Sequence, residues 1–362
     1  MVDSIWCFKY AYELYQPLLN SSNSMYSLLK KVLFTLDPET SHDLSLDLLG
    51  ASERLGLINL FSSKIPSDPV SILGLTFDNP VGLAAGLDKN GDYFNALGQF
   101  GFGFVEIGTI TPKPQAGNTK PRMFRLENEQ AIINRMGFNN KGLEYLVERV
   151  KRRRYKGVLG INIGKNKVTS EQDALSDYRL AMEAVYPYAD YITVNISSPN
   201  TPGLRNLQFG DNLKQLLAGL KETQHNLAAV HNGYKPILVK IAPDMSDDEI
   251  KSVAETLVAY EIDGVIATNT TLDRSLVADS AHASEMGGLS GAPLTDAATN
   301  MITQLRSHVG NLPIIGVGGI MQGSDAIAKI QAGADLVQIY SGFIYNGPEL
   351  ITDARRAILE AR

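Results

Sequence analysis

The sequence contains a single cysteine, Cys7, among its 362 residues. One thiol cannot build an intrachain disulfide framework, a cysteine-rich zinc site or a self-contained iron–sulfur cluster, which needs about four thiolates. The five histidines show no His-x-x-x-His spacing, so we expect no metal site. It also follows that no cysteine serves as a nucleophile or base in the main body of the chain.

The chain also lacks a surplus of basic residues and any long apolar run. Its formal net charge is −6, which argues against a nucleic-acid partner because such binding needs a strong basic footprint. No segment reaches the ~18 uninterrupted apolar residues of a membrane span. The start of the chain includes Asp3 and Glu13 and lacks the basic and apolar regions of a secretory signal. Residues 1–24 are treated as an N-terminal extension, because they stand apart from the pattern that follows.

Residues 25–65 are predicted to form a small helical domain. Apolar residues recur at helical spacing within residues 28–36. A second helix is predicted to begin at Asp37 and Pro38, which suit the N-cap and the first turn, and to end near Gly56. The apolar faces of these two amphipathic helices either pack on the main domain or contact lipid, and the pattern leaves both interpretations open.

From residue 80 onward, short apolar runs alternate with helical patterns. Near-continuous apolar runs are typical of parallel strands that are buried on both faces. Eight such units match a (β/α)8 barrel, which usually needs about 250 residues. An open, doubly wound sheet is disfavoured because the chain carries no GxGxxG fingerprint. The eight runs span residues 80–88, 102–110, 157–165, 191–199, 236–243, 264–270, 313–320 and 336–343.

The main domain is therefore predicted to be an α/β barrel over residues 66–362. Residues 66–79 precede the first strand and are expected to form a hairpin under the barrel floor. In this fold the active site gathers at the carboxyl ends of the strands. The residues that follow each apolar run are thus the candidates for chemistry.

The predicted strand ends carry lysines, amides and hydroxyls but few acids. Lys89, Lys165 and Lys240 add attraction for a carboxylate, a phosphate or a reduced cofactor. Asparagine amides suit planar ligands with alternating donors and acceptors. Asp88 is the only carboxylate at these ends. Glycoside hydrolysis is disfavoured without paired carboxylates, and serine-hydrolase chemistry is disfavoured without a histidine-bearing triad.

The last two strand ends predict a phosphate pocket. The glycines of GVGGI, residues 316–320, precede a predicted helix start at Ser324, and bare backbone N–H groups at a helix start bind phosphate. Tyr340 and Ser341 end the eighth strand beside them. Lys240 leaves a second interpretation open, because a lysine in an apolar barrel can form a Schiff base as in an aldolase. A non-catalytic barrel that only binds its ligand is a third.

Eight strings occur in one order along the chain: GLAAGLDKNG (82–91), GTITPKPQ (108–115), NRMGFNN (134–140), NISSPNTPGLR (195–205), VKIAPD (239–244), ATNTT (267–271), GGLSG (287–291) and GVGGI (316–320). Together they resemble the dihydroorotate dehydrogenases of the quinone-linked, membrane-associated class. The resemblance runs from about Met25 to the C-terminus. Soluble members have a cysteine at the position of the catalytic base, whereas this chain has Ser198 there.

The resemblance implies oxidation of dihydroorotate to orotate in de novo pyrimidine (UMP) biosynthesis, with hydride transfer to an FMN cofactor. Ser198 is the implied catalytic base. The implied substrate-binding residues are Lys89, Asn134, Arg135, Met136, Gly137, Phe138, Asn195, Asn200, Asn269 and Thr270. The implied FMN-binding residues are Ala85, Gly86, Leu87, Asp88, Lys89, Thr109, Asn162, Asn195, Lys240, Thr268, Gly291, Gly319, Tyr340 and Ser341.

The resemblance further implies that a membrane quinone, either ubiquinone or menaquinone, re-oxidises the FMN. His42, Arg125 and Tyr340 match the positions that meet the quinone in such enzymes. The helical domain is then expected to face the membrane surface. The protein is accordingly predicted to be a monomeric, peripheral membrane protein on the cytoplasmic face of a bacterial inner membrane.

Overall fold

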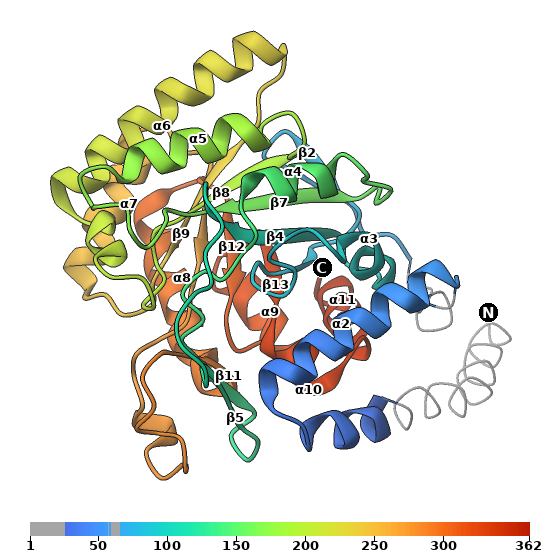
Figure 1. Ribbon diagram of the computed structural model, residues 1–362. Coiled ribbons are helices and arrows are strands. Elements are labelled where there is room, and N and C mark those ends of the chain that lie inside the picture. The colour runs from blue at the N-terminus through green and yellow to red at the C-terminus, as the bar shows by residue number, and fades with distance from the viewer. Residues whose placement is uncertain (1–25, 57, 59–65) are drawn as a thin grey trace, which may run out of the picture.

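The centre of the molecule is a closed barrel of eight parallel strands (Figure 1), in a computed structural model that describes residues 26–56, 58 and 66–362. The last strand pairs with the first through Val337 and Val81, which closes the sheet. All eight predicted strands are present, so the predicted barrel is confirmed. The barrel strands are β3 (Val81–Leu83), β4 (Phe104–Ile110), β7 (Val158–Ile163), β8 (Tyr191–Asn195), β9 (Ile237–Ile241), β10 (Gly264–Ala267), β12 (Ile314–Val317) and β13 (Leu336–Ile339).

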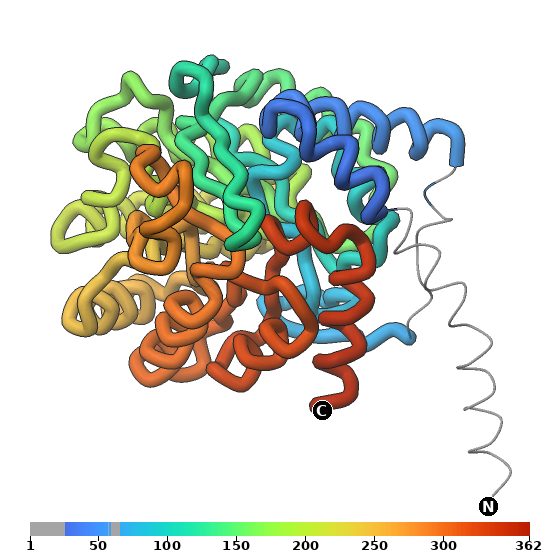
Figure 2. Tube along the Cα trace, turned by 90° about the horizontal axis from the view of Figure 1, so that it is seen from below, coloured from blue at the N-terminus to red at the C-terminus, as the bar shows by residue number. Residues whose placement is uncertain are grey.

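Helices surround the barrel and cover the outer face of its strands (Figure 2). Both faces of these strands are therefore buried, which explains their near-continuous apolar sequences. The longer helices are α4 (Leu143–Val150), α5 (Ala174–Val185), α6 (Gly210–His231), α7 (Asp247–Ala259), α8 (Thr295–Val309), α9 (Gly323–Gln331) and α11 (Glu349–Ala361). The shorter ones are α3 (Phe94–Leu97), α10 (Ser341–Asn346) and the 3-10 turns η2 (Gly98–Phe100), η3 (Leu204–Gln208), η4 (Ser275–Val277) and η5 (Ala292–Leu294).

A hairpin closes the floor of the barrel, as the sequence predicts. Its strands are β1 (Val70–Ile72) and β2 (Leu75–Phe77), which pair antiparallel. The ring of Phe77 packs edge-on against Phe104 of β4, with the ring centroids 5.1 Å apart. The floor is thus filled by aromatic side chains, which leaves the opposite end of the barrel for ligands.

A three-stranded antiparallel sheet beside the barrel mouth was not predicted. It consists of β5 (Met123–Leu126), β6 (Ala131–Asn134) and β11 (Gly288–Gly291). β6 lies in the middle: it forms a hairpin with β5, whereas its other partner, β11, lies more than 150 positions later in the sequence. Such long-range pairing leaves no local signal, and a strand of sequence GLSG has little intrinsic β-propensity.

The helical segment before the barrel has the two predicted helices. Residues 26–34 form the first, and α2 (Pro38–Arg54) the second, with the Asp37 side chain accepting the backbone N–H groups of Glu39 and Thr40. A row of large apolar side chains on this segment is exposed: Leu28, Leu29, Val32, Leu36, Leu44, Leu48 and Leu55. Within the described ranges, no helix has the length and apolar character needed to cross a bilayer. The predicted extension over residues 1–24 and the end of the predicted helical domain, residues 59–65, lie outside the described residues.

Candidate active site

A pocket opens where the carboxyl ends of the barrel strands meet. The ends of β3, β9, β10, β12 and β13 line it, and residues of the β5–β6–β11 sheet form one wall. Parallel strands of a closed barrel all end on the same face, so residues far apart in the sequence converge there. The predicted site residues that line the pocket are Ala85, Gly86, Lys89, Asn134, Met136, Lys240, Thr268, Asn269, Thr270, Gly291, Gly319, Tyr340 and Ser341.

Two lysines bring positive charge to this pocket. The Lys89 ammonium donates to the carbonyl oxygen of Gly86 at 2.8 Å. Burial lowers the pKa of Lys89 to about 8, and the nearby carboxylate of Glu39 partly opposes that shift. Burial also lowers the pKa of Lys240, whose ammonium has no hydrogen-bond partner among the described residues. Both side chains are thus available to an anionic ligand.

Three buried polar residues connect the barrel interior to the pocket. The Thr109 hydroxyl donates to Oδ1 of Asn162 at 2.6 Å and accepts from Nδ2 of Asn195 at 3.0 Å. Oδ1 of Asn195 in turn accepts from Nδ2 of Asn269, at 3.4 Å. Asn269 lines the pocket, so Thr109, Asn162 and Asn195 belong to one hydrogen-bonded chain that ends there.

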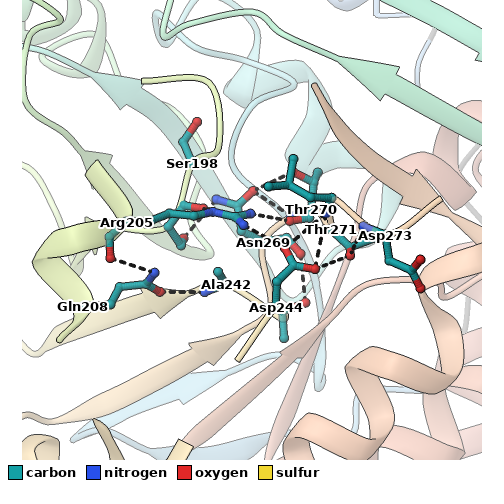
Figure 3. Close-up of polar contacts among 12 residues, drawn as sticks. Ser198, Arg205, Gln208, Ala242, Asp244, Asn269, Thr270, Thr271 and Asp273 are labelled. Carbon is teal, nitrogen blue, oxygen red and sulfur yellow. Dashed lines mark hydrogen bonds and ion pairs between the residues drawn. The ribbon is translucent and has the colours of Figure 1, made fainter. Parts of the chain in front are cut away.

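Ser198 lies in the segment that follows β8, three residues after Asn195. Its Oγ accepts a hydrogen bond from the backbone N–H of Asn200 at 3.2 Å, and the residue is 6% exposed. Figure 3 shows the Ser198 hydroxyl directed away from the polar cluster around Arg205. The Asn200 amide donates to the carbonyl oxygen of Asn134 at 3.1 Å, which ties this segment to the wall of the pocket.

Arg205 holds the Ser198 segment against two neighbouring strand ends (Figure 3). Its guanidinium donates to the carbonyl oxygens of Ser197 at 3.0 Å and Thr270 at 2.9 Å. It also forms an ion pair with Asp244 at 2.7 Å. Asp244 in turn accepts a hydrogen bond from the Thr271 hydroxyl. A planar guanidinium with five donors can bridge three elements at once, and here it fixes the backbone beside Ser198.

The far end of the pocket is a bare backbone cradle. Gly319 has a φ of +71°, and a Cβ at this position would lie 2.3 Å from the backbone of Thr295 at the start of α8. The Thr295 hydroxyl donates to the carbonyl oxygen of Gly319 at 2.7 Å, which locks the loop onto this helix. The hydroxyls of Ser341 and Ser290 lie 2.8 Å apart beside it. Helix starts, hydroxyls and uncovered N–H groups form a donor set that fits a phosphate.

Two predicted cofactor residues lie behind the pocket and do not line it. The Asp88 carboxylate accepts the backbone N–H groups of Asp92 at 2.9 Å and Tyr93 at 2.7 Å, before α3. Burial raises the pKa of Asp88 to about 6. Leu87 is buried in the main apolar core. The side chains of both residues therefore shape the turn that presents Lys89.

The segment from Asn134 to Phe138 is split between the pocket and its surroundings. Asn134 and Met136 line the pocket, whereas Arg135 points away and pairs with Glu285 at 2.6 Å. The carbonyl oxygen of Gly137 accepts from the Gln115 side chain at 3.0 Å. Phe138 is buried in the apolar core.

His42 and Arg125 lie where the helical segment meets the barrel domain. Arg125 donates to the carbonyl oxygen of Phe34 at 2.9 Å and lies 4.5 Å from the centre of its ring. The second terminal nitrogen of Arg125 is buried and has no hydrogen-bond partner in the described part of the chain. Burial, helped by the charge of Lys89, lowers the pKa of His42 to about 3. Tyr340, the third residue of this group, is on the pocket wall.

The comparisons with known proteins agree with this geometry. The model of the family Dihydroorotate dehydrogenase matches residues 69–361. The chain belongs to the dihydroorotate dehydrogenase family. The dihydroorotate dehydrogenase (quinone) of Saccharophagus degradans is 63% identical, over 93% of this chain and 100% of that protein. The enzyme of the same name from Teredinibacter turnerae is 62% identical, over 92% of this chain and 99% of the other.

These alignments confirm the predicted family, the quinone-dependent class and the enzyme class. Because they cover more of the chain than the barrel, they extend into the helical segment. The ligand-free dihydroorotate dehydrogenase of Eimeria tenella superposes with a TM-score of 0.82, at 40% identity over 90% of this chain and 94% of that one. The same enzyme in complex with ferulenol gives a TM-score of 0.81 at 38% identity, over 90% of this chain and 91% of that one.

Sequence reasoning missed several residues of this dihydroorotate dehydrogenase site. Ser290 and Gln338 line the pocket, and Glu106 is buried inside the barrel below it. Glu106 and Gln338 each interrupt an apolar strand with a polar residue, FVEIG and LVQIY, and that interruption is a usable signal. Arg205 and Asp244 stand within the quoted motifs, yet only the tertiary structure shows that they pair.

Proposed function

We propose that this chain oxidises dihydroorotate to orotate in pyrimidine biosynthesis, using FMN at the barrel mouth and a membrane quinone as the final acceptor. The observation that carries the proposal is the convergence of two lysines and several amides in one pocket that continues into a bare phosphate cradle. Membership of the quinone-dependent family supports the same reaction.

The substrate is expected to bind near Lys89, Asn134 and Asn269. Orotate carries a carboxylate and a planar ring with alternating donors and acceptors. Lys89 supplies a charge for the carboxylate, while each asparagine amide can both donate and accept along the ring edge. Asn195 and Thr270 are hydrogen-bonded to the side-chain amide of Asn269, and Asn200 to that of Asn134, so these three complete the proposed set.

Ser198 is the proposed base that removes the proton from C5 of dihydroorotate. A serine hydroxyl is a weak base and needs activation by a neighbouring group. Thr201 is close in sequence and has a buried hydroxyl that lacks a hydrogen-bond partner among the described residues. This hydroxyl is proposed to relay the proton, releasing its own to water as it accepts one from Ser198, and Arg205 holds the backbone beside Ser198 in place.

FMN fits the remainder of the pocket by the chemistry of its donors. Gly319, Gly291 and Ser341 are proposed to hold the phosphate end, and Lys240 with Thr268 the ring end. When bound, FMN would supply the two-electron redox chemistry that takes up the hydride from C6 and passes the electrons to the quinone. The unpartnered ammonium of Lys240 suits the negative charge of a reduced cofactor.

The quinone is proposed to enter between the helical segment and the barrel, near His42, Arg125 and Tyr340. The unused donor of Arg125 supports this placement, since a buried donor without a partner is costly. The exposed apolar row on the two helices supports a peripheral position on a membrane surface. We further propose that the enzyme is a monomer at the cytoplasmic face of a bacterial inner membrane.

The proposal is tested by the colour of the purified protein. We expect a yellow holoenzyme whose flavin absorbance dihydroorotate bleaches without oxygen and whose colour a ubiquinone analogue restores. A protein that stays colourless when FMN is supplied, or a flavin that dihydroorotate does not reduce, contradicts the proposal. Borohydride trapping of a substrate on Lys240 would instead identify a Schiff-base lyase.

A further inference from the structure

A carboxylate is buried at the centre of the barrel, below the pocket. Glu106 of β4 has no exposed surface and accepts three hydrogen bonds. Oε1 accepts from Nδ2 of Asn162 at 2.8 Å, while Oε2 accepts from the Tyr191 hydroxyl at 2.9 Å and from Nε2 of Gln338 at 2.9 Å. Burying a charge costs free energy unless hydrogen bonds compensate it, and three donors are arranged around the Glu106 carboxylate to do so.

The carboxylate sets the direction of the hydrogen-bonded chain above it. A carboxylate only accepts, so the amide nitrogen of Asn162 has to face Glu106 and its oxygen has to face Thr109. The Thr109 hydroxyl donates to that oxygen and is left to accept from the Asn195 amide nitrogen. Each hydrogen bond in this series fixes the side-chain orientation of the next residue.

This series of hydrogen bonds ends at the wall of the pocket. With its nitrogen on Thr109, Asn195 turns its oxygen toward the amide nitrogen of Asn269, on the pocket wall. Glu106 is also the one charged group that acts on Lys240 within the described residues, and its charge opposes the lowering of the pKa of Lys240 by burial. A single buried carboxylate therefore acts on both the amides and the lysine of the site.

We propose that Glu106 is a positioning residue, which orients Asn162, Thr109 and Asn195 toward the cofactor and the substrate. Glu106 touches neither ligand and acts only through these residues. The inference rests on the proposed function, since it assigns the ligand-facing amides to orotate and FMN. It extends that function by identifying Glu106 as the group that fixes the orientation of these amides.

The first test is Glu106→Gln in the full-length holoenzyme. Glutamine offers one acceptor oxygen where the site has donors on both sides, so one side has to rearrange, and the counter-charge is lost. We expect the dissociation constant of orotate, measured by perturbation of the oxidised flavin spectrum, to rise about tenfold. FMN retention and the melting temperature are recorded for each variant, so that a loss of fold is recognised.

The second test moves the carboxylate by one residue. In the double variant Glu106→Gln with Gln338→Glu, the new amide can accept from Asn162 and donate to the new carboxylate, which keeps the charge in the barrel. We expect orotate binding to return to within about threefold of wild type, because the two sites are in contact and their effects are coupled. A purely steric role of Glu106 predicts no such recovery.

Thr193→Val is the matched control. Thr193 is fully buried on the barrel strand β8, two strands from β4, and its hydroxyl has no hydrogen-bond partner among the described residues. The hydroxyl lies on the residue paired with Asn162 in the sheet but forms none of the hydrogen bonds described above, so orotate affinity in Thr193→Val should stay within about twofold of wild type.

The outcomes separate this inference from the proposed function. Wild-type protein that binds neither FMN nor orotate contradicts the function itself. Wild-type protein that binds both, with equal orotate affinity in Glu106→Gln, overturns the role of Glu106 alone. Should Glu106→Gln not fold, Gln338→Glu alone serves as the reference: it places two carboxylates in contact, and adding Glu106→Gln must then improve binding. Failure of that improvement also overturns the inference.

Discussion

The eight barrel strands bury nearly all of their apolar side chains, whereas the helices over residues 26–54 leave a row of theirs exposed. Val105 and Ile161 have no exposed surface, but Leu28 is 66% exposed and Val32 60% exposed. Both regions are amphipathic or apolar in sequence, so composition does not distinguish them. What distinguishes them is whether the fold supplies a partner surface, and the helical segment is left with a face that suits a lipid surface.

The two regions divide the proposed reaction between them. The barrel holds the residues proposed for dihydroorotate and FMN, and the helical segment adds His42 and the surface proposed for the quinone and the membrane. Changes in the barrel should therefore affect flavin reduction, and changes on the exposed helical face should affect quinone reduction. The following predictions test this division, from the largest expected effect to the smallest.

Ser198→Ala should have the largest effect. Loss of the base is expected to slow flavin reduction by dihydroorotate by at least ~10²-fold, on the scale of general-base catalysis. Stopped-flow absorbance measures this half-reaction directly, and FMN content should not change. Re-oxidation of reduced enzyme by quinone should proceed at the wild-type rate. Near wild-type flavin reduction in this variant would remove Ser198 from the mechanism.

Glu39→Gln tests the contact that joins the regions. The Glu39 carboxylate pairs with Arg122 of the barrel domain at 2.7 Å, and both side chains are buried. Breaking a buried pair leaves an uncompensated charge, so we expect the free energy of unfolding to fall by about 3 kcal/mol. Glu53→Gln on the same helix is the control, because its partner Arg154 is largely exposed, and a surface pair contributes about 1 kcal/mol or less. Similar losses in both variants, measured by urea unfolding, contradict this difference.

The triple variant Leu28→Ser, Val32→Ser and Leu48→Ser removes apolar surface from the exposed helical face. We expect about tenfold weaker binding to phospholipid vesicles and slower reduction of a membrane-embedded quinone. Flavin reduction by dihydroorotate should stay unchanged. The matched control replaces Leu180, Val230 and Val258 by serine, which are exposed on α5, α6 and α7 across the barrel (Figure 1). Equal losses in both variants would show that this face has no special role.

The smallest effect is a pH dependence at Lys89. The pKa of Lys89 is lowered to about 8, mainly by burial, so its ammonium is charged below that pH and becomes neutral above it. Because the proposed partner is a carboxylate, orotate affinity should weaken severalfold as the pH rises from 7 to about 9. Lys89→Arg keeps its charge over this pH range, so its orotate affinity should not weaken between pH 7 and about 9, although its absolute orotate affinity will differ. A step of the same size in Lys89→Arg assigns the titration to another group.

The sequence was sufficient for the barrel because its signals are local and repeated. Each strand is an apolar run followed by a polar turn, and eight repeats in one order leave few alternatives. It was not sufficient for the β5–β6–β11 sheet, whose strands are four residues long and in which β6 and β11 pair over a long sequence distance. Asp37 and Pro38 predicted the start of α2 correctly, because capping depends only on neighbouring residues.

The candidate site, like the fold, was predicted only in part from the sequence. Motif residues such as Lys89, Asn269 and Gly319 were named from the sequence and come together in the pocket. Arg135 was named with them, yet its side chain points to Glu285, because a contiguous motif alternates the direction of its side chains in an extended segment. Placement in a motif therefore does not establish that a side chain faces the ligand.

By itself, the sequence determined the eight barrel strands, the order of the barrel units and the chemical types gathered at the strand ends. These depend on residue type and spacing along the chain. Only the tertiary structure decided that Glu106 accepts a hydrogen bond from Asn162, that Arg205 holds the Ser198 segment against Asp244, and that the apolar face of the first two helices is left uncovered. Those features depend on distances between segments that are remote in sequence, and closing the barrel is what sets them.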